Sequence, residues 1–278
     1  MPELPEVEIT RRGLLLLINQ TVSKVVIRNA SMRWPVPAHL PETLQNQQLV
    51  GLTRRAKYIL AEFFDSNNAA NSGTLLLHLG MSGRITLLDR SYPPEKHDHF
   101  DIVFEDGRVL RLRDPRRFGA VLWAGSKPSE HALLMPLGPE PLDDIFNAKY
   151  LHSQLKVRSA AIKVAIMDSH LVVGVGNIYA SESLFRARIH PETPAKNLSL
   201  KQCEKLVAEI KTTLNAALDA GGSSLRDFFG VDGNIGYFQQ EYFVYGRTDE
   251  PCKVCGKSIK CIRLGQRSTF FCSHCQKS

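Results

Sequence analysis

One stretch decides how the C-terminal part of the chain folds: CKVCGKSIKCIRLGQRSTFFCSHC, residues 252–275. Two residues separate Cys252 from Cys255, two separate Cys272 from Cys275, and sixteen lie between the pairs. Two such pairs supply four thiolates to a tetrahedral Zn²⁺ ion, and the residues between them can form a short β-hairpin. Because four protein ligands leave no open coordination position, we expect one structural zinc rather than a catalytic one.

Positive charge is concentrated in the same part of the chain. Residues 242–278 contain seven Lys or Arg and two Asp or Glu, so they carry +5 of the net charge of +7. Lys and Arg bind phosphates favourably through charge pairing and through the release of counterions. This part of the chain therefore favours a polyanionic partner. Arg267 lies on the predicted strand that enters the second cysteine pair, a suitable position for binding a phosphate.

The N-terminal half of the chain has the pattern of an antiparallel β protein. Branched and aromatic residues gather in short runs that are separated by turn formers. Phe100, Ile102 and Phe104 alternate with polar residues, and Asp106-Gly107 then predicts a hairpin turn into a strand over 109–113. The other predicted strands are 22–28, 49–63, 73–79, 83–88 and 120–124.

The second half of the chain has a helical pattern. Before it, prolines and a glycine interrupt any helical or strand periodicity of the apolar residues. We interpret residues 135–149 as a linker. Helices are predicted over 151–168 and 177–188. A Ser-x-x-Gln capping box at Ser199 begins a third helix, which Gly221 ends.

No apolar run approaches the length of a membrane span. The longest run, residues 14–18, is far shorter than the ~18 to 20 residues that a bilayer requires. It follows three glutamates, and a secretory signal does not begin with acids. We therefore expect a cytoplasmic protein without a membrane partner, in which cysteines stay reduced and can bind metal.

The N-terminus carries a candidate nucleophile. Pro2 follows Met1, and removal of Met1 leaves a secondary amine that can form an iminium. An α-amine has a pKa of about 7.7 to 8.0, so a useful fraction is unprotonated at neutral pH. Glu3 and Glu6 lie beside it and can transfer protons. The same acids equally suit the start of a helix predicted over 5–18.

Five motifs follow one another along the chain. They are PELPEVE at 2–8, LGMSG at 79–83, DPRRFG at 114–119, GVGNIYASE at 174–182 and the cysteine hairpin. In this order they resemble the formamidopyrimidine-DNA glycosylase family over nearly the whole chain. The resemblance implies an α+β fold: an N-terminal β-sandwich with an N-terminal helix, then a helical helix–two-turn–helix region and a C-terminal zinc-finger β-hairpin. The implied domains are 1–134 (catalytic β-sandwich), 135–149 (linker), 150–241 (helix–two-turn–helix with a lesion loop) and 242–278 (zinc finger).

The resemblance also implies a bifunctional enzyme of base excision repair. Such an enzyme excises 8-oxoguanine and formamidopyrimidines from damaged double-stranded DNA and then cleaves the strand by β,δ-elimination. Pro2 is then expected to attack the sugar C1′ and form a Schiff base. Glu3 is expected to protonate the opening sugar, and Glu6 to support this arrangement. Lys57 matches the family's strand lysine, which holds the phosphate near the damaged nucleotide.

Three further residues match those that fill the space left by the damaged base. A base cannot react inside the stack, so it must be flipped out, and the flip leaves a hole in the duplex. Met81 and Phe118 are apolar wedges, and Arg116 can hydrogen-bond the orphaned cytosine. Glycines adjoin Met81 and Phe118, which suits exposed loop tips.

Other residues match the family's contacts to DNA. Asn177 begins a predicted helix after a Gly-rich turn, and a helix N-terminus favours a phosphate. The other phosphate contacts that we expect are His78, Tyr179 and Arg267. Arg226 and Tyr237, in a Gly-rich stretch that resembles the loop over the flipped base, are candidate contacts to the lesion.

Two alternatives remain open. The first is an enzyme similar to endonuclease VIII, which prefers oxidised pyrimidines; the three void-filling residues argue against it. The second is a non-catalytic DNA-binding protein. Pro2 and the two acids beside it argue against this, because binding alone places no demand on residue 2. By the family's habit, we expect a monomer.

Overall fold

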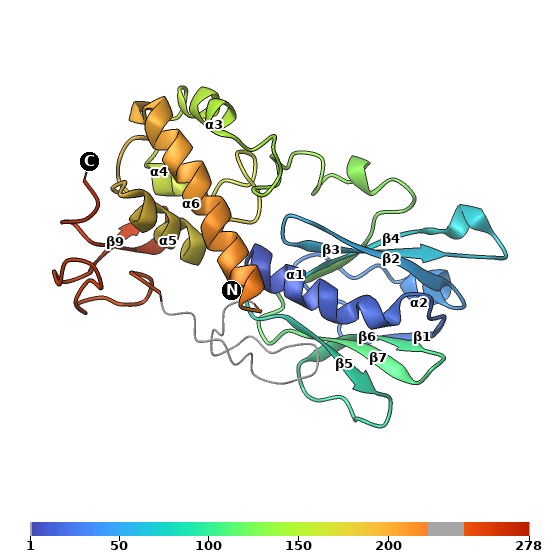
Figure 1. Cartoon of the computed structure of the whole chain (residues 1–278). Coiled ribbons are helices and arrows are strands. Elements are labelled where there is room, and N and C mark those ends of the chain that lie inside the picture. Colours follow the sequence, from blue (N-terminus) through green and yellow to red (C-terminus); the bar gives the residue numbers. More distant parts are fainter. Residues whose placement is uncertain (1, 222–241, 278) are drawn as a thin grey trace. The chain divides into compact units, whose positions relative to one another are not determined.

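The computed structural model describes residues 2–221 and 242–277, so the predicted lesion contacts Arg226 and Tyr237 lie outside the described residues. The described chain divides into two compact units (Figure 1). Unit 1 covers residues 2–135 and Gly221, and unit 2 covers residues 136–220 together with 242–277.

Unit 1 contains two four-stranded antiparallel sheets (Figure 1). The strand order is β1-β6-β7-β5 in one sheet and β2-β3-β4-β8 in the other. The helices of unit 1 are α1 (Leu4–Gly13), the 3₁₀ helix η1 (Leu14–Leu17), α2 (Leu40–Leu44), η2 (Ala69–Asn71) and η3 (Pro128–Glu130). The strands are β1 (Val22–Ile27), β2 (Gln48–Arg55), β3 (Tyr58–Phe64), β4 (Gly73–His78), β5 (Arg84–Asp89), β6 (Asp98–Phe104), β7 (Arg108–Arg113) and β8 (Ala120–Trp123).

One apolar core draws on both sheets and on the N-terminal helix. In β6, Phe100, Ile102 and Phe104 are buried, as their alternation with polar residues predicts. Val7 of α1 and Leu14 of η1 join the same core. The predicted β-sandwich with an N-terminal helix is therefore confirmed, and so is the hairpin between β6 and β7.

Two predicted elements of unit 1 differ from the structure. The strand predicted over 49–63 is two strands, β2 and β3, because the chain turns at Ala56 and Lys57. Ala56 has a left-handed backbone with φ of 55°, which a continuous strand does not allow. Lys57 therefore lies in a turn rather than on a strand. The helix predicted over 5–18 is α-helical only to Gly13, a poor helix former, and tightens into η1 beyond it.

Unit 2 is mainly helical and ends in a two-stranded hairpin. Its α5 and α6 match the predicted second and third helices, and the capping box between Ser199 and Gln202 is present. Within the described ranges of the chain, no helix is long and apolar enough to cross a bilayer. The elements are α3 (Ala148–Leu155), α4 (Ile162–Ala165), α5 (Asn177–Ala187), η4 (Ala195–Asn197), α6 (Leu200–Asp219), β9 (Lys260–Leu264) and β10 (Arg267–Phe271).

The helix predicted over 151–168 is wrong. It is broken into α3 and α4, because the backbone between them pairs with a distant segment of the chain. The N–H of Ile162 donates to the carbonyl of Thr193 at 2.8 Å, and the N–H of Lys196 donates to the carbonyl of Arg158 at 2.9 Å. Such pairing is non-local, so the local period of the sequence does not reveal it.

Much of the predicted linker packs against unit 2. Phe146 is fully buried, and the N–H of Gly138 donates to the carbonyl of Ser169 at 2.8 Å. In the same region the ammonium of Lys211 donates to the carbonyl of Asp143 at 2.9 Å. Residues 136–147 are therefore an ordered part of this unit, and the domain borders drawn from the sequence stay a prediction.

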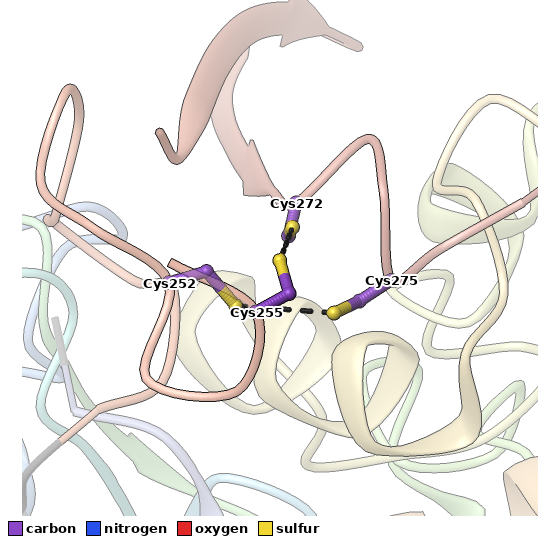
Figure 2. A group of neighbouring side chains, drawn as sticks. All are labelled: Cys252, Cys255, Cys272 and Cys275. Carbon is purple, nitrogen blue, oxygen red and sulfur yellow. Dashed lines mark hydrogen bonds between the residues drawn. The ribbon is translucent and has the colours of Figure 1, made fainter. Parts of the chain in front are cut away.

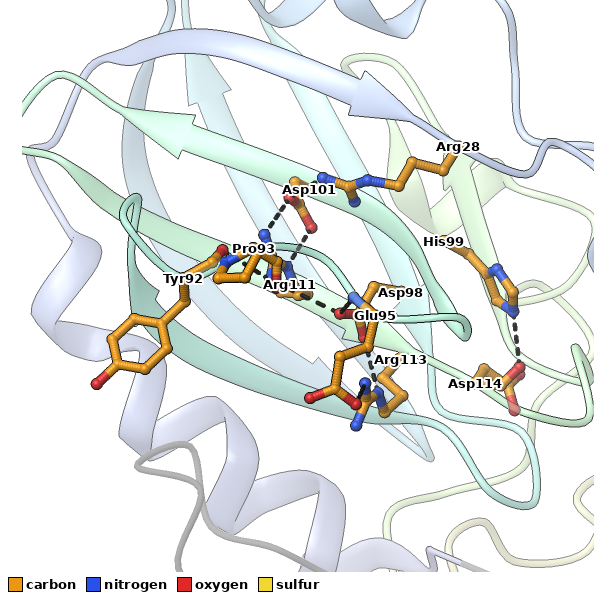
Figure 3. A network of polar contacts seen from close by, with 10 residues as sticks. All are labelled: Arg28, Tyr92, Pro93, Glu95, Asp98, His99, Asp101, Arg111, Arg113 and Asp114. Carbon is orange, nitrogen blue, oxygen red and sulfur yellow. Dashed lines mark hydrogen bonds and ion pairs between the residues drawn. The ribbon is translucent and has the colours of Figure 1, made fainter.

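Buried charges cross-link the β1-β6-β7 sheet (Figure 3). The guanidinium of Arg111, 5% exposed, donates to both oxygens of Asp101 at 3.0 and 2.9 Å. Arg28 reaches Asp101 at 2.5 Å, and Arg113 reaches Asp98 at 2.8 Å. Burial opposes the charged form of Asp101, but the hydrogen bonds and charges of Arg28 and Arg111 outweigh it and lower its pKa. The network thus ties β6 and β7 to each other and to Arg28, the residue that follows β1.

We expect Arg111→Met to destabilise unit 1 by about 3 to 5 kcal/mol, because it leaves the buried Asp101 without its main partner. Both tryptophans of the chain lie in unit 1, so their fluorescence during urea unfolding reports on this unit. Folding lowers the pKa of Asp101, so its contribution is present at neutral pH and is lost as the pH falls through the folded-state pKa. The difference between wild type and variant should therefore shrink on acidification.

The matched control is Arg108→Met, which breaks the more exposed pair between Arg108 and Asp106 in the neighbouring turn. It should change the stability by less than about 1 kcal/mol. Equal effects of the two substitutions would contradict a special contribution from the buried network.

Candidate functional site

Two buried carboxylates lie at the start of α1. The backbone N–H of Glu3 donates to Oε2 of Glu6 at 2.8 Å, and the Glu3 carboxylate accepts the backbone N–H of Glu6 in return. Both residues are 1% exposed, whereas Pro2 is half-buried. This capping box fixes the backbone of Glu3 and so also restricts the residue before it. The structure therefore brings Pro2, Glu3 and Glu6 together.

Basic side chains gather where β3 begins and β4 ends. Tyr58 pairs with His78 across these strands, and their ring centroids lie 4.7 Å apart. Lys57 occupies the turn just before Tyr58. Arg33, whose charge acts on His78, is exposed and stacks on the ring of Trp34 at 4.6 Å. The cluster presents two permanent charges and an imidazole, which suits an anion such as a phosphate.

His78 is neutral at physiological pH. Burial, together with the charges of Lys57 and Arg33, lowers its pKa to about 4. Its Nδ1 accepts the backbone N–H of Gly80 at 3.0 Å, so the ring proton resides on Nε2. A neutral imidazole in this tautomer can donate one hydrogen bond to a phosphate oxygen without adding charge.

We predict that His78 of the free protein titrates with a midpoint near pH 4. Its Cε1–H resonance, assigned by its disappearance in His78→Gln, should not shift between pH 8 and about pH 5.5. Because folding lowers this pKa, His78 destabilises the fold only as the pH falls below its unfolded value of about 6.5. A titration midpoint near 6.5 would show instead that the ring is solvated.

The expected void-filling residues lie on two neighbouring loops. Phe118 is 42% exposed, and the guanidinium of Arg116 stacks over its ring at 4.8 Å. Met81, in the turn after β4, is half-buried and thus less exposed than its predicted place at a loop tip suggests. Their insertion into DNA stays a prediction.

In unit 2, the motif that contains Asn177 meets the cysteine hairpin. Asn177 is the first residue of α5, after Gly176 at the N-cap. Its Nδ2 donates to the carbonyl of Ser268 at 2.9 Å, next to the exposed Arg267 at the start of β10. The helix N-terminus adds favourable partial charge for an anion. Two predicted phosphate contacts, Asn177 and Arg267, therefore come together.

A buried lysine that the sequence analysis missed orients this amide. Lys163 is fully buried, and its ammonium donates to Oδ1 of Asn177, to the carbonyl of Ser268 at 3.3 Å and to Oγ1 of Thr269 at 2.9 Å. Because Oδ1 faces the ammonium, Nδ2 is left as the donor end of Asn177. The only signal in the sequence was the apolar setting of Lys163, with Ile162 before it.

Two other residues of the same motif point into unit 2. Tyr179 is 1% exposed, so its ring offers little surface to a phosphate, and the contact expected of it stays a prediction. Glu182, which the sequence analysis also missed, is 4% exposed. Its carboxylate accepts the backbone N–H groups of Phe243, Val244 and Tyr245, each at 2.9 Å. This clamp fixes the segment that leads into the cysteine hairpin.

The four predicted metal ligands converge (Figure 2). Their sulfur atoms all lie within 4.8 Å of one another, with Cys252 at 3.9 Å from Cys275 and Cys255 at 3.5 Å from Cys272. Zn–S bonds of about 2.3 Å place the sulfurs of a tetrahedron about 3.8 Å apart, so the cluster fits zinc. Burial and the neighbouring thiols raise the pKa of Cys275 to about 12, and a bound dication would offset this repulsion.

We predict one zinc ion per chain, measured by elemental analysis of the purified protein. Cys272→Ser should lose the zinc and weaken DNA binding, because it removes a buried ligand from the hairpin that carries Arg267. Cys261→Ser is the matched control, since Cys261 is exposed on β9 and outside the cluster. Loss of zinc from both variants, or from neither, would contradict the assignment of ligands.

Known proteins resemble this chain from end to end. Models of the formamidopyrimidine-DNA glycosylase N-terminal domain, of its H2TH domain and of the zinc finger found in FPG and IleRS match residues 1–121, 137–229 and 249–277. The formamidopyrimidine-DNA glycosylase of Methylobacillus flagellatus is 65% identical over 277 residues, covering 100% of this chain and 97% of that protein. That of Herminiimonas arsenicoxydans is 51% identical, with 100% of both chains covered.

Solved structures show the same likeness. The crystal structure of the MutM (FPG) protein from Thermus thermophilus has a TM-score of 0.87 and 35% identity, covering 99% of this chain and 98% of that chain. The Lactococcus lactis Fpg in complex with DNA that contains an abasic site has a TM-score of 0.89 and 33% identity, covering 99% and 100%.

Proposed function

This chain belongs to the formamidopyrimidine-DNA glycosylase family, and on that premise we propose how its residues divide the work. The protein is a zinc-containing DNA repair enzyme that excises oxidised purines and cleaves the strand at the resulting abasic site. The observation that carries the assignment of roles is the burial of Glu3 and Glu6 beside residue 2.

The nucleophile is the secondary amine of Pro2, exposed when Met1 is removed. Its lone pair attacks C1′ of the damaged nucleotide, and the amine loses its N–H proton to the Glu3 carboxylate. The bond from C1′ to the base breaks, and the base departs with its bonding electrons and takes up a proton from water. The Glu3 carboxyl gives a proton to the sugar ring oxygen as the ring opens, which leaves an iminium between C1′ and Pro2. Glu6 keeps Glu3 in place through the capping box.

The iminium makes strand cleavage possible. It acidifies the C2′ hydrogen, so loss of that proton expels the 3′ phosphate, and a second elimination expels the 5′ phosphate. Lys57 and the Nε2–H of His78 hold a phosphate of the damaged strand in unit 1. Asn177 and Arg267 hold backbone phosphates in unit 2, where Lys163 orients the amide.

The remaining residues serve recognition. Met81, Phe118 and Arg116 enter the space left by the flipped base. One structural zinc, bound by the four clustered cysteines, shapes the hairpin that carries Arg267. We also propose that the enzyme acts as a monomer in the cytoplasm, where the cysteines stay reduced.

We expect Pro2→Gly to abolish most strand cleavage on duplexes with 8-oxoguanine opposite cytosine, while the affinity for the same DNA stays within a few-fold. Glu3→Gln should slow excision by about 10² to 10⁴-fold, because it removes the proton donor. Gel-based cleavage and binding assays on both variants, with an oxidised-pyrimidine duplex alongside, test this.

Undiminished cleavage by Pro2→Gly would contradict a requirement for the secondary amine, because glycine at this position offers only a primary amine. Faster wild-type cleavage of the oxidised-pyrimidine duplex would overturn the proposed preference for purines.

A further inference from the structure

A buried carboxylate joins the loop that carries Met81 to the loop that carries Arg116. Asp114 is fully buried. Its Oδ1 accepts the hydroxyl of Ser82 at 2.7 Å, and its Oδ2 accepts the backbone N–H of Gly119 at 2.7 Å. The Ser82 oxygen in turn accepts the backbone N–H of Arg116 at 3.2 Å. One carboxylate and one hydroxyl therefore connect both loops.

The main chain of Asp114 is anchored to the strand beside it. Its N–H donates to the carbonyl of His97 at 3.0 Å, and its carbonyl accepts Nε2 of His99 at 2.9 Å (Figure 3). His99 is 6% exposed, at the start of β6. These contacts attach the carboxylate to the sandwich, so the two loops are fixed to the sheet as well as to each other.

Glycines let the two loops pack backbone against backbone. Gly80 has φ of 62°, and a Cβ there would lie 2.4 Å from the nitrogen of Gly119 and 2.4 Å from the carbonyl carbon of Phe118. A Cβ at Gly119 would lie 2.6 Å from the carbonyl oxygen of His78 and 3.0 Å from Oδ2 of Asp114. No side chain fits between the loops, so movement of one displaces the other.

We propose that Asp114 is a positioning residue that holds Met81, Arg116 and Phe118 as one preorganised wedge. The inference rests on the proposed function, in which these side chains replace a flipped base. Three side chains that enter the base stack together bind DNA more tightly when their loops are already ordered in the free protein. Ordering the loops during binding would cost conformational entropy and so weaken the complex. Neither Asp114 nor Ser82 needs to touch DNA for this role.

The test is Asp114→Asn, which keeps the shape of the side chain. An amide has one acceptor oxygen, so it must present N–H groups either to the backbone N–H of Gly119 or to the backbone N–H of Arg116, which donates to Oδ1 of Asp114 at 3.3 Å. Single-turnover excision of 8-oxoguanine opposite cytosine should slow by about 10- to 100-fold. The preference for cytosine over adenine opposite the lesion should fall at least about fivefold, because Arg116 is no longer held in place.

The change in opposite-base preference separates positioning from a loss of folded protein. Partial unfolding lowers the active fraction equally for both duplexes and leaves their ratio unchanged. Asp106→Asn, the same substitution at an exposed turn of unit 1, is the matched control and should match wild type. A wild-type rate for Asp114→Asn, or a slower rate with an unchanged ratio, would overturn the proposal.

A second pair of variants covers the case in which Asp114→Asn does not fold. Ser82→Ala removes only the link to the Met81 loop and should lower both the rate and the preference, whereas Ser82→Thr keeps the hydroxyl and should restore them. Equal behaviour of the two Ser82 variants would contradict the proposal. If wild type itself fails to excise 8-oxoguanine, the proposed function fails, which is a separate result.

Discussion

The hydrogen bond from the Glu3 backbone N–H to the Glu6 carboxylate is the interaction on which the rest depends. It turns the first residues of the chain, which would otherwise fray, into the ordered start of α1. Both carboxylates are buried, while α1 and η1 contribute Val7 and Leu14 to the sandwich core. An N-terminal amine is a usable nucleophile only when its position is fixed, and the sandwich supplies that position.

Both units use buried charged groups to orient polar ones. In unit 1, Asp114 connects two loops and the start of β6, and in unit 2, Lys163 orients Asn177 beside the hairpin. Burying a charge is unfavourable unless several hydrogen bonds satisfy it, and each of these groups has several. The ion pair between Arg111 and Asp101 instead holds the neighbouring strands β6 and β7 together. Burial of charge therefore marks the places where geometry must be kept.

The sequence predicted those features that depend on local patterns. The cysteine spacing, the hairpin at Asp106-Gly107 and the capping box at Ser199 each follow from a few adjacent residues, and the structure has all three. The helix predicted over 151–168 was wrong because distant backbone groups compete with it. Lys163 and Glu182 were missed because a single charged residue is usually solvated, and only tertiary contacts reveal that these two are buried.

The most direct test of the central claim is the location of the covalent intermediate. Borohydride reduces the iminium while the enzyme acts on a duplex with 8-oxoguanine opposite cytosine, and mass spectrometry of the digested adduct identifies the modified residue. We predict a single adduct on the nitrogen of Pro2, in a peptide that lacks Met1. An adduct on a lysine such as Lys57, or on a peptide that retains Met1, would contradict it.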